Sequence, residues 1–340
     1  MKSRLIRGLA AAGQLRVLAV DSKRLVEEAR RRHTTSASAT AALGRALSGA
    51  ALLAQLLSKG RRERVTLIID GDGPLGGLVA EAGVDGRVRG YVKNPDAEVE
   101  PRADGKLNVG ALIGSGQLRV IRALASGEQY DSTVPLQSGE IAEDIAYYLW
   151  QSEQQPAALL LGVMLAPSGE VASAGGLLLQ VTPDAGEEVL ARLQDNLSRT
   201  AGFSSLLHER GLQGAAQEVL RGLDLEWRAP QAANLEELAI DFVCRCSREK
   251  ALVALSYFTP QEREEMIAED GGAEVVCHWC GAKYTFSPEQ LRSLNAREQR
   301  CPDCGTLWYE SRADGVEVVY PHERCKCGRK VDIVKESPSA

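Results

Sequence analysis

The cysteines are the residues of this chain whose type and spacing could do chemistry. The chain has 340 residues and eight cysteines, and all eight follow Val243. They form four close pairs: Cys244-x-Cys246, Cys277-x-x-Cys280, Cys301-x-x-Cys304 and Cys325-x-Cys327. Two thiolates one or two residues apart can bind the same ion, and two such pairs supply the tetrahedral four-sulfur set that zinc prefers. The spacing therefore predicts zinc binding in the C-terminal part of the chain.

Spacing leaves open how these pairs are shared between sites. Twenty residues separate Cys280 from Cys301, and twenty also separate Cys304 from Cys325. In one arrangement the two central pairs form a ribbon-type site and the outer pairs form another. In the other arrangement the first two pairs form one site and the last two form a second. A different chemistry, thiol oxidoreduction, requires a Cys-x-x-Cys pair that binds no zinc.

Composition and compartment favour metal or redox chemistry over structural disulfides. The chain is 44% hydrophobic and 25% charged, which excludes a mainly disordered protein. No long apolar segment follows residues 1–4, and the longest apolar run, 157–166, is too short to span a bilayer. We therefore expect a cytoplasmic protein with no membrane partner, in a compartment where stable disulfides are rare.

The charge distribution argues against a nucleic-acid partner. The formal net charge is −6. Residues 231–340 carry 14 Lys and Arg against 19 Asp and Glu, so −5 of that charge lies with the cysteines. Nucleic-acid binders usually present a basic patch, because phosphate contacts dominate affinity. A zinc-ribbon module that binds nucleic acid or protein is kept as an alternative function, which salt-dependent binding would test.

The elements that must position the cysteines begin with an N-terminal α+β domain, predicted over residues 1–230. An Ala- and Leu-rich helix over 40–59 is apolar on almost all sides and is placed in the core. The β-branched run 64–70 opens an antiparallel meander that includes 107–113 and 117–123. Ser138 is expected to cap the helix that follows it, and 157–166 pairs with 171–181 as a hairpin.

Three further segments are predicted after this domain. Residues 231–276 form a helical linker that includes the first cysteine pair, 277–295 complete a zinc-binding domain, and 296–340 form a zinc-ribbon-like extension. Thr259 and Ser287 each begin a capping box. The linker helices are short and acidic, so they would be marginal without a metal to hold them.

Other motifs have simpler explanations than a site. The glycine-rich run 71–77 lacks the Gly-Lys-Ser/Thr ending of a phosphate loop and is interpreted as a turn. The basic run Arg30-Arg-Arg-His33 is interpreted as a solvated helix end, and His208 as a structural residue. No catalytic residue is predicted.

An ordered series of motifs resembles the heat shock protein 33 family of redox-regulated holdases. The resemblance covers about residues 4–295. It is carried by Gly13-Gln-Leu-Arg-Val17, Glu27-x-x-Arg-Arg-Arg-His33, Ala42-Leu-Gly-Arg-Ala46, Gly71-Asp-Gly-Pro-Leu-Gly76, Val88-Arg-Gly-Tyr-Val92, Ser138-Gly-Glu-Ile-Ala-Glu-Asp144, Gln151-Ser-Glu-Gln154, Phe242-x-Cys-x-Cys-Ser-Arg-Glu249, Glu269-Asp-Gly-Gly-Ala-Glu274 and Cys277-x-x-Cys-Gly281.

The resemblance implies a switch rather than an enzyme, with 231–276 as a redox-sensitive linker and 277–295 as the rest of a zinc-binding redox-switch domain. In the reduced state Cys244, Cys246, Cys277 and Cys280 would hold one zinc ion as thiolates, with the chaperone inactive. Oxidants would join neighbouring cysteines as disulfides and release the zinc, so that the linker unfolds and exposes apolar surface. The partners implied are unfolding client proteins and, when oxidised, a second copy of the chain. No ATP is required.

The C-terminal extension departs from the family pattern. Cys301, Cys304, Cys325 and Cys327 flank a strand-like segment, 315–320, and are hypothesised to form a second four-sulfur zinc site, which would bring the total to two zinc ions per chain. The client-binding surface is not located by the sequence. The two candidates are sheet surface between Leu67 and Val92 and a set of apolar linker residues, and both are equally compatible with ordinary packing. The linker set is Leu252, Leu255, Phe258, Met266 and Ile267.

Overall fold

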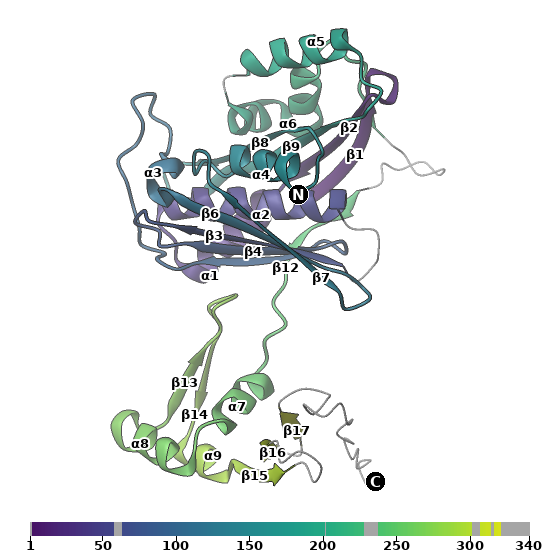
Figure 1. Ribbon diagram of the computed structural model, residues 1–340. Coiled ribbons are helices and arrows are strands. Elements are labelled where there is room, and N and C mark those ends of the chain that lie inside the picture. The colour runs from purple at the N-terminus through teal and green to yellow at the C-terminus, as the bar shows by residue number, and fades with distance from the viewer. Residues whose placement is uncertain are drawn as a thin grey trace. The chain divides into compact units, whose positions relative to one another are not determined.

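The computed structural model describes residues 2–57, 63–200, 202–227, 237–300, 307–313 and 316–320. Two compact units divide the chain, Met1–Cys244 and Arg245–Ala340 (Figure 1). The division falls inside the first cysteine pair. Each unit has its own hydrophobic core, and they are described separately below.

The first unit contains two six-stranded sheets. One has the order β10-β1-β2-β9-β8, with β11 also paired to β1; the other has the order β12-β5-β4-β3-β6-β7. The strands of the first sheet are β1 (Arg4–Ala10), β2 (Leu15–Asp21), β8 (Ala157–Leu165), β9 (Val171–Val181), β10 (Glu226–Trp227) and β11 (Leu238–Ala239). Those of the second are β3 (Arg64–Gly71), β4 (Leu78–Gly83), β5 (Arg87–Val92), β6 (Gly116–Ala123), β7 (Gln129–Pro135) and β12 (Asp241–Phe242).

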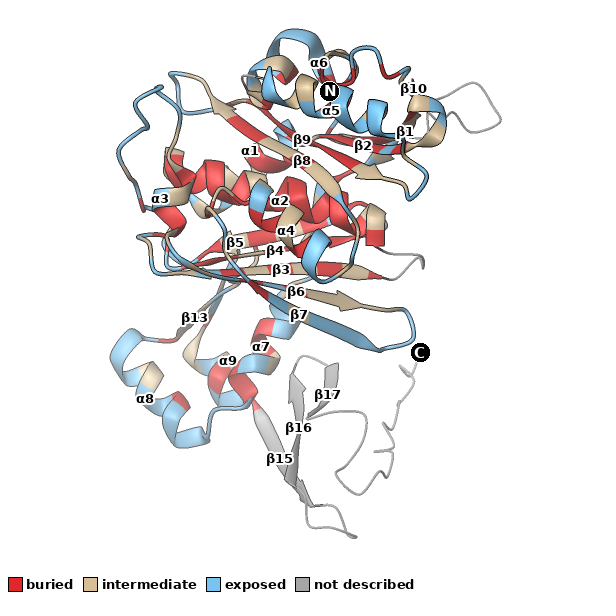
Figure 2. Ribbon diagram, turned by 45° about the horizontal axis from the view of Figure 1, so that its top comes forward, coloured by how far each residue is buried: buried red, intermediate tan, exposed pale blue. Residues whose placement is uncertain are grey.

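Helix α2 (Ala37–Leu57) lies between these sheets, as Figures 1 and 2 show. Small residues let its neighbours approach closely: a Cβ on Gly44 would lie 2.7 Å from side-chain atoms of both Val26 and Val163. By length and composition alone this helix could cross a membrane, but 83% of the qualifying window is buried inside the protein. The predicted core helix is thus confirmed, and its first residue is Ala37.

The remaining helices of the first unit form two groups: the first three in chain order contact α2, and the last two pack together beyond the first sheet. They are α1 (Lys23–His33), α3 (Val109–Ile113), α4 (Ala142–Gln151), α5 (Glu187–Ser198) and α6 (Phe203–Val219). Helix α6 covers the first sheet on the face away from α2, where Leu207 and Leu212 join a second apolar cluster with Val17. These sheets and helices confirm the predicted α+β class.

One predicted strand of the meander is wrong. Residues 109–113, expected to extend the sheet, form the short helix α3. The side chain of Asn108 accepts a hydrogen bond from the Ala111 N–H at its first turn. An Asn N-cap satisfies a backbone donor that a strand would leave for a neighbouring chain segment, so it favours the helical turn.

The start of α4 differs from the prediction that Ser138 caps it. Helix α4 begins at Ala142. The buried Asp144 carboxylate accepts four hydrogen bonds from the loop before the helix. The donors are the backbone N–H groups of Gln137, Ser138, Gly139 and Ile141. Ile141 has φ of 70°, a left-handed conformation that is a genuine outlier for a β-branched residue. The carboxylate therefore holds a strained turn in place.

Replacing Asp144 with alanine is expected to lower the free energy of unfolding of the first unit by about 3–5 kcal/mol, because several buried donors lose their acceptor. Asp144→Asn keeps one oxygen acceptor and should lose clearly less. Chemical denaturation followed by circular dichroism measures both variants. Equal losses for the two, or a loss below about 1 kcal/mol for Asp144→Ala, would contradict this role.

The segment 237–243, here called the strap, joins both sheets of the first unit. Its β11 pairs antiparallel with β1, and its β12 pairs parallel with β5. Between these strands Ile240 is 1% exposed, and its N–H donates to the Ser3 carbonyl at 3.1 Å. The strap ends where the Val243 N–H donates to the Val88 carbonyl at 2.9 Å. The backbone is therefore fixed on the first unit up to Val243, the residue before Cys244.

The end of helix α1 contacts the strap and is not simply a solvated helix end. The guanidinium of Arg32 lies 5.0 Å from the ring centroid of Phe242, and the His33 ring meets the same ring edge-on at 6.3 Å. Part of the basic run thus packs against an aromatic residue two positions before the first cysteine.

The second unit begins with two short helices and a hairpin. Its elements are α7 (Arg248–Ser256), α8 (Pro260–Asp270), β13 (Ala273–Val276), β14 (Lys283–Phe286), α9 (Pro288–Ser293), β15 (Asn295–Arg300), β16 (Leu307–Ala313) and β17 (Val316–Tyr320). The capping boxes predicted at Thr259 and Ser287 are both present, and β17 matches the strand expected near 315–320. Up to residue 294, where its side chains are described, six residues form a buried apolar cluster: Ala251, Leu252, Leu255, Phe286, Leu291 and Leu294.

This cluster bears on the linker residues considered for client binding. Leu252 and Leu255 are core residues of the second unit, whereas Phe258 is 41% exposed. In this state the first two serve as ordinary packing.

Candidate metal centre

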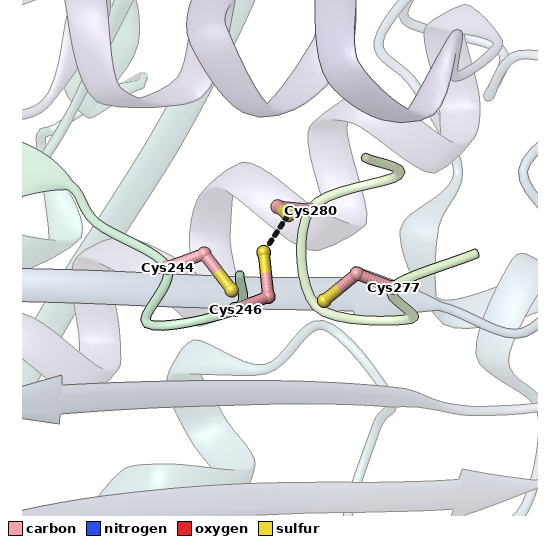
Figure 3. Close-up of side chains that lie close together, drawn as sticks. All are labelled: Cys244, Cys246, Cys277 and Cys280. Atoms are coloured by element: carbon pink, nitrogen blue, oxygen red, sulfur yellow. Dashed lines mark hydrogen bonds between the residues drawn. The ribbon is translucent and has the colours of Figure 1, made fainter. Parts of the chain in front are cut away.

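Four cysteine sulfurs converge at one place. Cys244 and Cys246 follow the strap, and Cys277 and Cys280 lie in the turn between β13 and β14 (Figure 3). All four sulfur atoms lie within 4.8 Å of one another, and none of these cysteines is in a disulfide. Cys280 is 3% exposed, and the other three are half-buried. The structure thus brings together the first two pairs predicted from the sequence.

The hairpin turn presents the second pair as a compact loop. Strands β13 and β14 pair antiparallel up to Val276 opposite Lys283. Beyond them the Cys277 N–H donates to the Ala282 carbonyl at 2.8 Å, and the Gly281 N–H donates to the Cys277 carbonyl at 2.8 Å. Gly281 has φ of 68°, which glycine adopts without steric cost. Gly281 therefore closes the loop that carries Cys277 and Cys280.

The first pair lies between two anchored residues. Val243 before it is hydrogen-bonded to β5, and Ser247 after it is the N-cap of α7, accepting from the Lys250 N–H at 3.3 Å. The Lys250 ammonium donates to the Arg245 carbonyl at 2.6 Å, which supports the backbone between the two cysteines.

The sulfur positions fit a tetrahedral zinc ion. A zinc–sulfur bond of about 2.3 Å places tetrahedral sulfurs about 3.8 Å apart. Here the Cys246 and Cys280 sulfurs are 3.3 Å apart, and every pair falls within 4.8 Å. Four thiolates with no carboxylate among them form a donor set that favours zinc over magnesium or calcium.

Tyr284, which sequence reasoning missed, contacts the cluster. Its hydroxyl donates a hydrogen bond to the Cys246 sulfur at 3.2 Å. This bond, together with burial, raises the pKa of Tyr284 to about 12, so the phenol keeps its proton at neutral pH. The hairpin turn at 277–282 brings Tyr284 of β14 back beside the cysteines. In the sequence, Gly281 was the one signal of this turn.

The C-terminal cysteines Cys301, Cys304, Cys325 and Cys327 lie outside the described residues. Their predicted second zinc site therefore stays a prediction.

Comparison with known proteins identifies the family. The sequence profile described as Hsp33 protein matches residues 3–287. The chain belongs to the Hsp33 family. A 33 kDa chaperonin of the bacterium Thermus thermophilus is 60% identical over 336 residues, covering 98% of this chain and 98% of the relative. The 33 kDa chaperonin of Deinococcus radiodurans is 48% identical over 299 residues, covering 87% of this chain and 99% of the relative.

A solved Hsp33 structure agrees with the fold. The crystal structure of a 33 kDa chaperonin from Thermotoga maritima matches with a TM-score of 0.77 and 38% identity, covering 86% of this chain and 97% of that one. The prediction of a redox-regulated chaperone, and not an enzyme, is confirmed by membership in the Hsp33 family.

The alignments with the Hsp33 relatives show which of them share the C-terminal extension, residues 296–340. The 2% of this chain outside the Thermus alignment is about seven of 340 residues, far fewer than the 45 residues of 296–340. Most of the extension therefore has a counterpart in Thermus, whereas the Deinococcus relative, aligned over 99% of its length, covers only 87% of this chain. The expectation that the extension sets this chain apart from its relatives is too broad.

Proposed function

We propose that this Hsp33-family chain is an ATP-independent holdase that is kept inactive by zinc bound to Cys244, Cys246, Cys277 and Cys280. Oxidation of these thiolates to disulfides activates it. The observation that carries the proposal is the convergence of the four sulfurs within 4.8 Å. Zinc bound there would supply folding free energy to the second unit, about 10–16 kcal/mol in small zinc modules.

The chain's own residues explain why the second unit would depend on this clamp. Among the side chains that the structure describes in this unit, six form the buried apolar cluster, three of them on α7. Helix α8 is mostly exposed, and Arg263 is its one buried residue. Short helices with so little packing are marginal in water. A disulfide sulfur is no longer an anionic ligand for zinc. Oxidation therefore releases the metal, and the helices unfold.

The partners proposed are unfolding proteins in the cytoplasm, bound through apolar surface that the melted segment exposes, and a second copy of the chain in the oxidised state. The predicted disulfides join neighbours, Cys244 to Cys246 and Cys277 to Cys280. The first closes a tight ring, so its formation is expected to be the more strained of the two.

The experiment for this proposal measures client aggregation and zinc release in the same sample. Reduced, zinc-loaded protein is treated with hypochlorite, and zinc is followed with a chromogenic chelator. We expect suppression of aggregation to rise in step with zinc release and to reverse on reduction in the presence of zinc. Zinc loss without any gain in suppression would overturn the proposal.

A second zinc site is proposed for Cys301, Cys304, Cys325 and Cys327, on their spacing alone. We expect two zinc ions per chain in protein prepared without oxygen, and one after the double change Cys301→Ser and Cys304→Ser. One zinc ion in the unaltered chain would contradict the second site and leave the first intact.

A further inference from the structure

Tyr284 joins the apolar cluster of the second unit to its sulfur cluster. It lies on β14 opposite Val275 of β13, and its partly buried ring packs against the six-residue core. Its hydroxyl reaches the Cys246 sulfur at 3.2 Å. One side chain thus contacts both the packing that holds the unit together and a sulfur that the proposed function oxidises.

The sulfur that receives this bond is held from two directions. Cys246 Sγ lies 3.2 Å from the Tyr284 hydroxyl and 3.3 Å from the sulfur of Cys280, which is 3% exposed. A donor on a thiolate withdraws electron density from the sulfur, and hydrogen bonds to metal-bound sulfurs tune their affinity and redox behaviour. The same bond occupies a lone pair that would otherwise attack an oxidant.

We propose that Tyr284 is a positioning residue that sets the oxidation threshold of the switch, by holding the Cys246 sulfur and lowering its nucleophilicity. This inference rests on the proposed function. With a peroxide as oxidant, a cysteine thiolate attacks one peroxide oxygen, forming an S–O bond as the O–O bond breaks. The sulfur gives up two electrons and hydroxide leaves. A second thiolate then attacks the sulfenic acid sulfur, forming the disulfide and releasing a second hydroxide.

The position of Tyr284 makes this threshold cooperative. While the core of the second unit is packed, the ring is held in place and the hydroxyl shields Cys246. Once another cysteine of the cluster is oxidised and the unit loosens, the ring leaves and Cys246 gains full nucleophilicity. The first oxidation event therefore accelerates the second, and intermediate states with a single oxidised cysteine are short-lived.

The test compares Tyr284→Phe with Tyr257→Phe in the full-length, zinc-loaded chain. Tyr257 supplies a second phenol in the same unit, at the C-cap of α7 and 49% exposed. Zinc release under excess peroxide should be about tenfold faster in Tyr284→Phe, and nearly unchanged in Tyr257→Phe. Zinc release to a chelator without oxidant is measured alongside, because a purely structural role would accelerate both kinds of release by the same factor.

Mass spectrometry supplies a readout at the sulfur itself. Brief peroxide treatment in the presence of a sulfenic-acid trap should label Cys246 more, relative to Cys277, in Tyr284→Phe than in the unaltered chain. Replacement of Tyr284 by 3-fluorotyrosine, a stronger hydrogen-bond donor of nearly the same shape, should slow zinc release below that of the unaltered chain.

The outcomes separate this inference from the proposed function. Equal acceleration with and without oxidant, or an unchanged labelling ratio, would overturn the role of Tyr284 while leaving the zinc switch in place. If the unaltered chain releases no zinc on oxidation, the proposed function fails. The Tyr284 inference is overturned separately if the ratio of Cys246 to Cys277 labelling is the same in Tyr284→Phe and in the unaltered chain.

Discussion

Cys280→Ser is expected to abolish metal binding at the first site and to leave the chain active as a holdase without any oxidant. Cys280 is the buried member of the sulfur cluster, and serine supplies no thiolate there. A three-sulfur set would forfeit most of the roughly 10–16 kcal/mol that metal contributes to folding a small zinc module. Because the described side chains of the second unit include only six in its buried apolar cluster, its helices should melt without the metal.

Three measurements check this prediction: zinc content, helical circular dichroism, and suppression of client aggregation under reducing conditions. Cys301→Ser is the matched control, since it removes a thiol from the other predicted set. It should also lose one zinc ion yet stay inactive until oxidised. Full zinc content and an inactive reduced state in Cys280→Ser would refute the assignment of Cys280 as a ligand.

Arg263→Ala is expected to destabilise the second unit by about 3 kcal/mol. Arg263 is 4% exposed, and one of its terminal nitrogens donates to the carbonyls of Leu291 and Leu294 at the end of α9. Burial lowers the pKa of this guanidinium, whose charge is compensated by carbonyl dipoles. Hydrogen bonds from a charged donor contribute about 1.5–3 kcal/mol each, and their loss removes the guanidinium donor from both carbonyls, of which that of Leu291 keeps only the Leu294 N–H at 3.4 Å.

The effect should appear as easier activation. A less stable unit binds zinc more weakly, so Arg263→Ala should release zinc at lower oxidant concentration and lower temperature than the unaltered chain. Arg292→Ala provides the matched comparison, because Arg292 and its partner Glu264 are both more than half exposed. Exposed ion pairs of this kind contribute little to stability. Similar shifts in the two arginine variants would show that the buried contacts carry no special weight.

The cysteine spacing indicated that close thiol pairs would meet, because each pair is a local signal, and four of the sulfurs do lie within 4.8 Å of one another. A Cys-x-x-Cys pair followed by Gly281 specifies a tight turn through backbone geometry alone, and the structure has that turn. The capping boxes at Thr259 and Ser287 were likewise readable, since each is completed within three residues. Family resemblance, rather than spacing, selected the grouping of the first two pairs.

Contacts between distant residues could not be predicted in this way. Tyr284 reaches Cys246 across 38 positions, and the carboxylate of Asp144 replaces the expected Ser138 cap because the loop before α4 turns back on the helix. The strap has only two-residue strands, too short to show any alternation in sequence. Its position depends on which sheet edges happen to be available, which is a property of the assembled fold.

The strap also has a consequence for resetting the switch. Ile240 is buried in the core of the first unit, and Cys244 follows only four residues later, a distance of at most about 14 Å when extended. Thirty residues separate Cys246 from Cys277, so even as a flexible coil the two pairs remain about 30 Å apart on average. A tether of this length keeps the partner thiols at millimolar effective concentration. Reassembly after reduction is then an intramolecular, first-order event, and its speed is governed by the supply of reductant and metal rather than by the amount of protein.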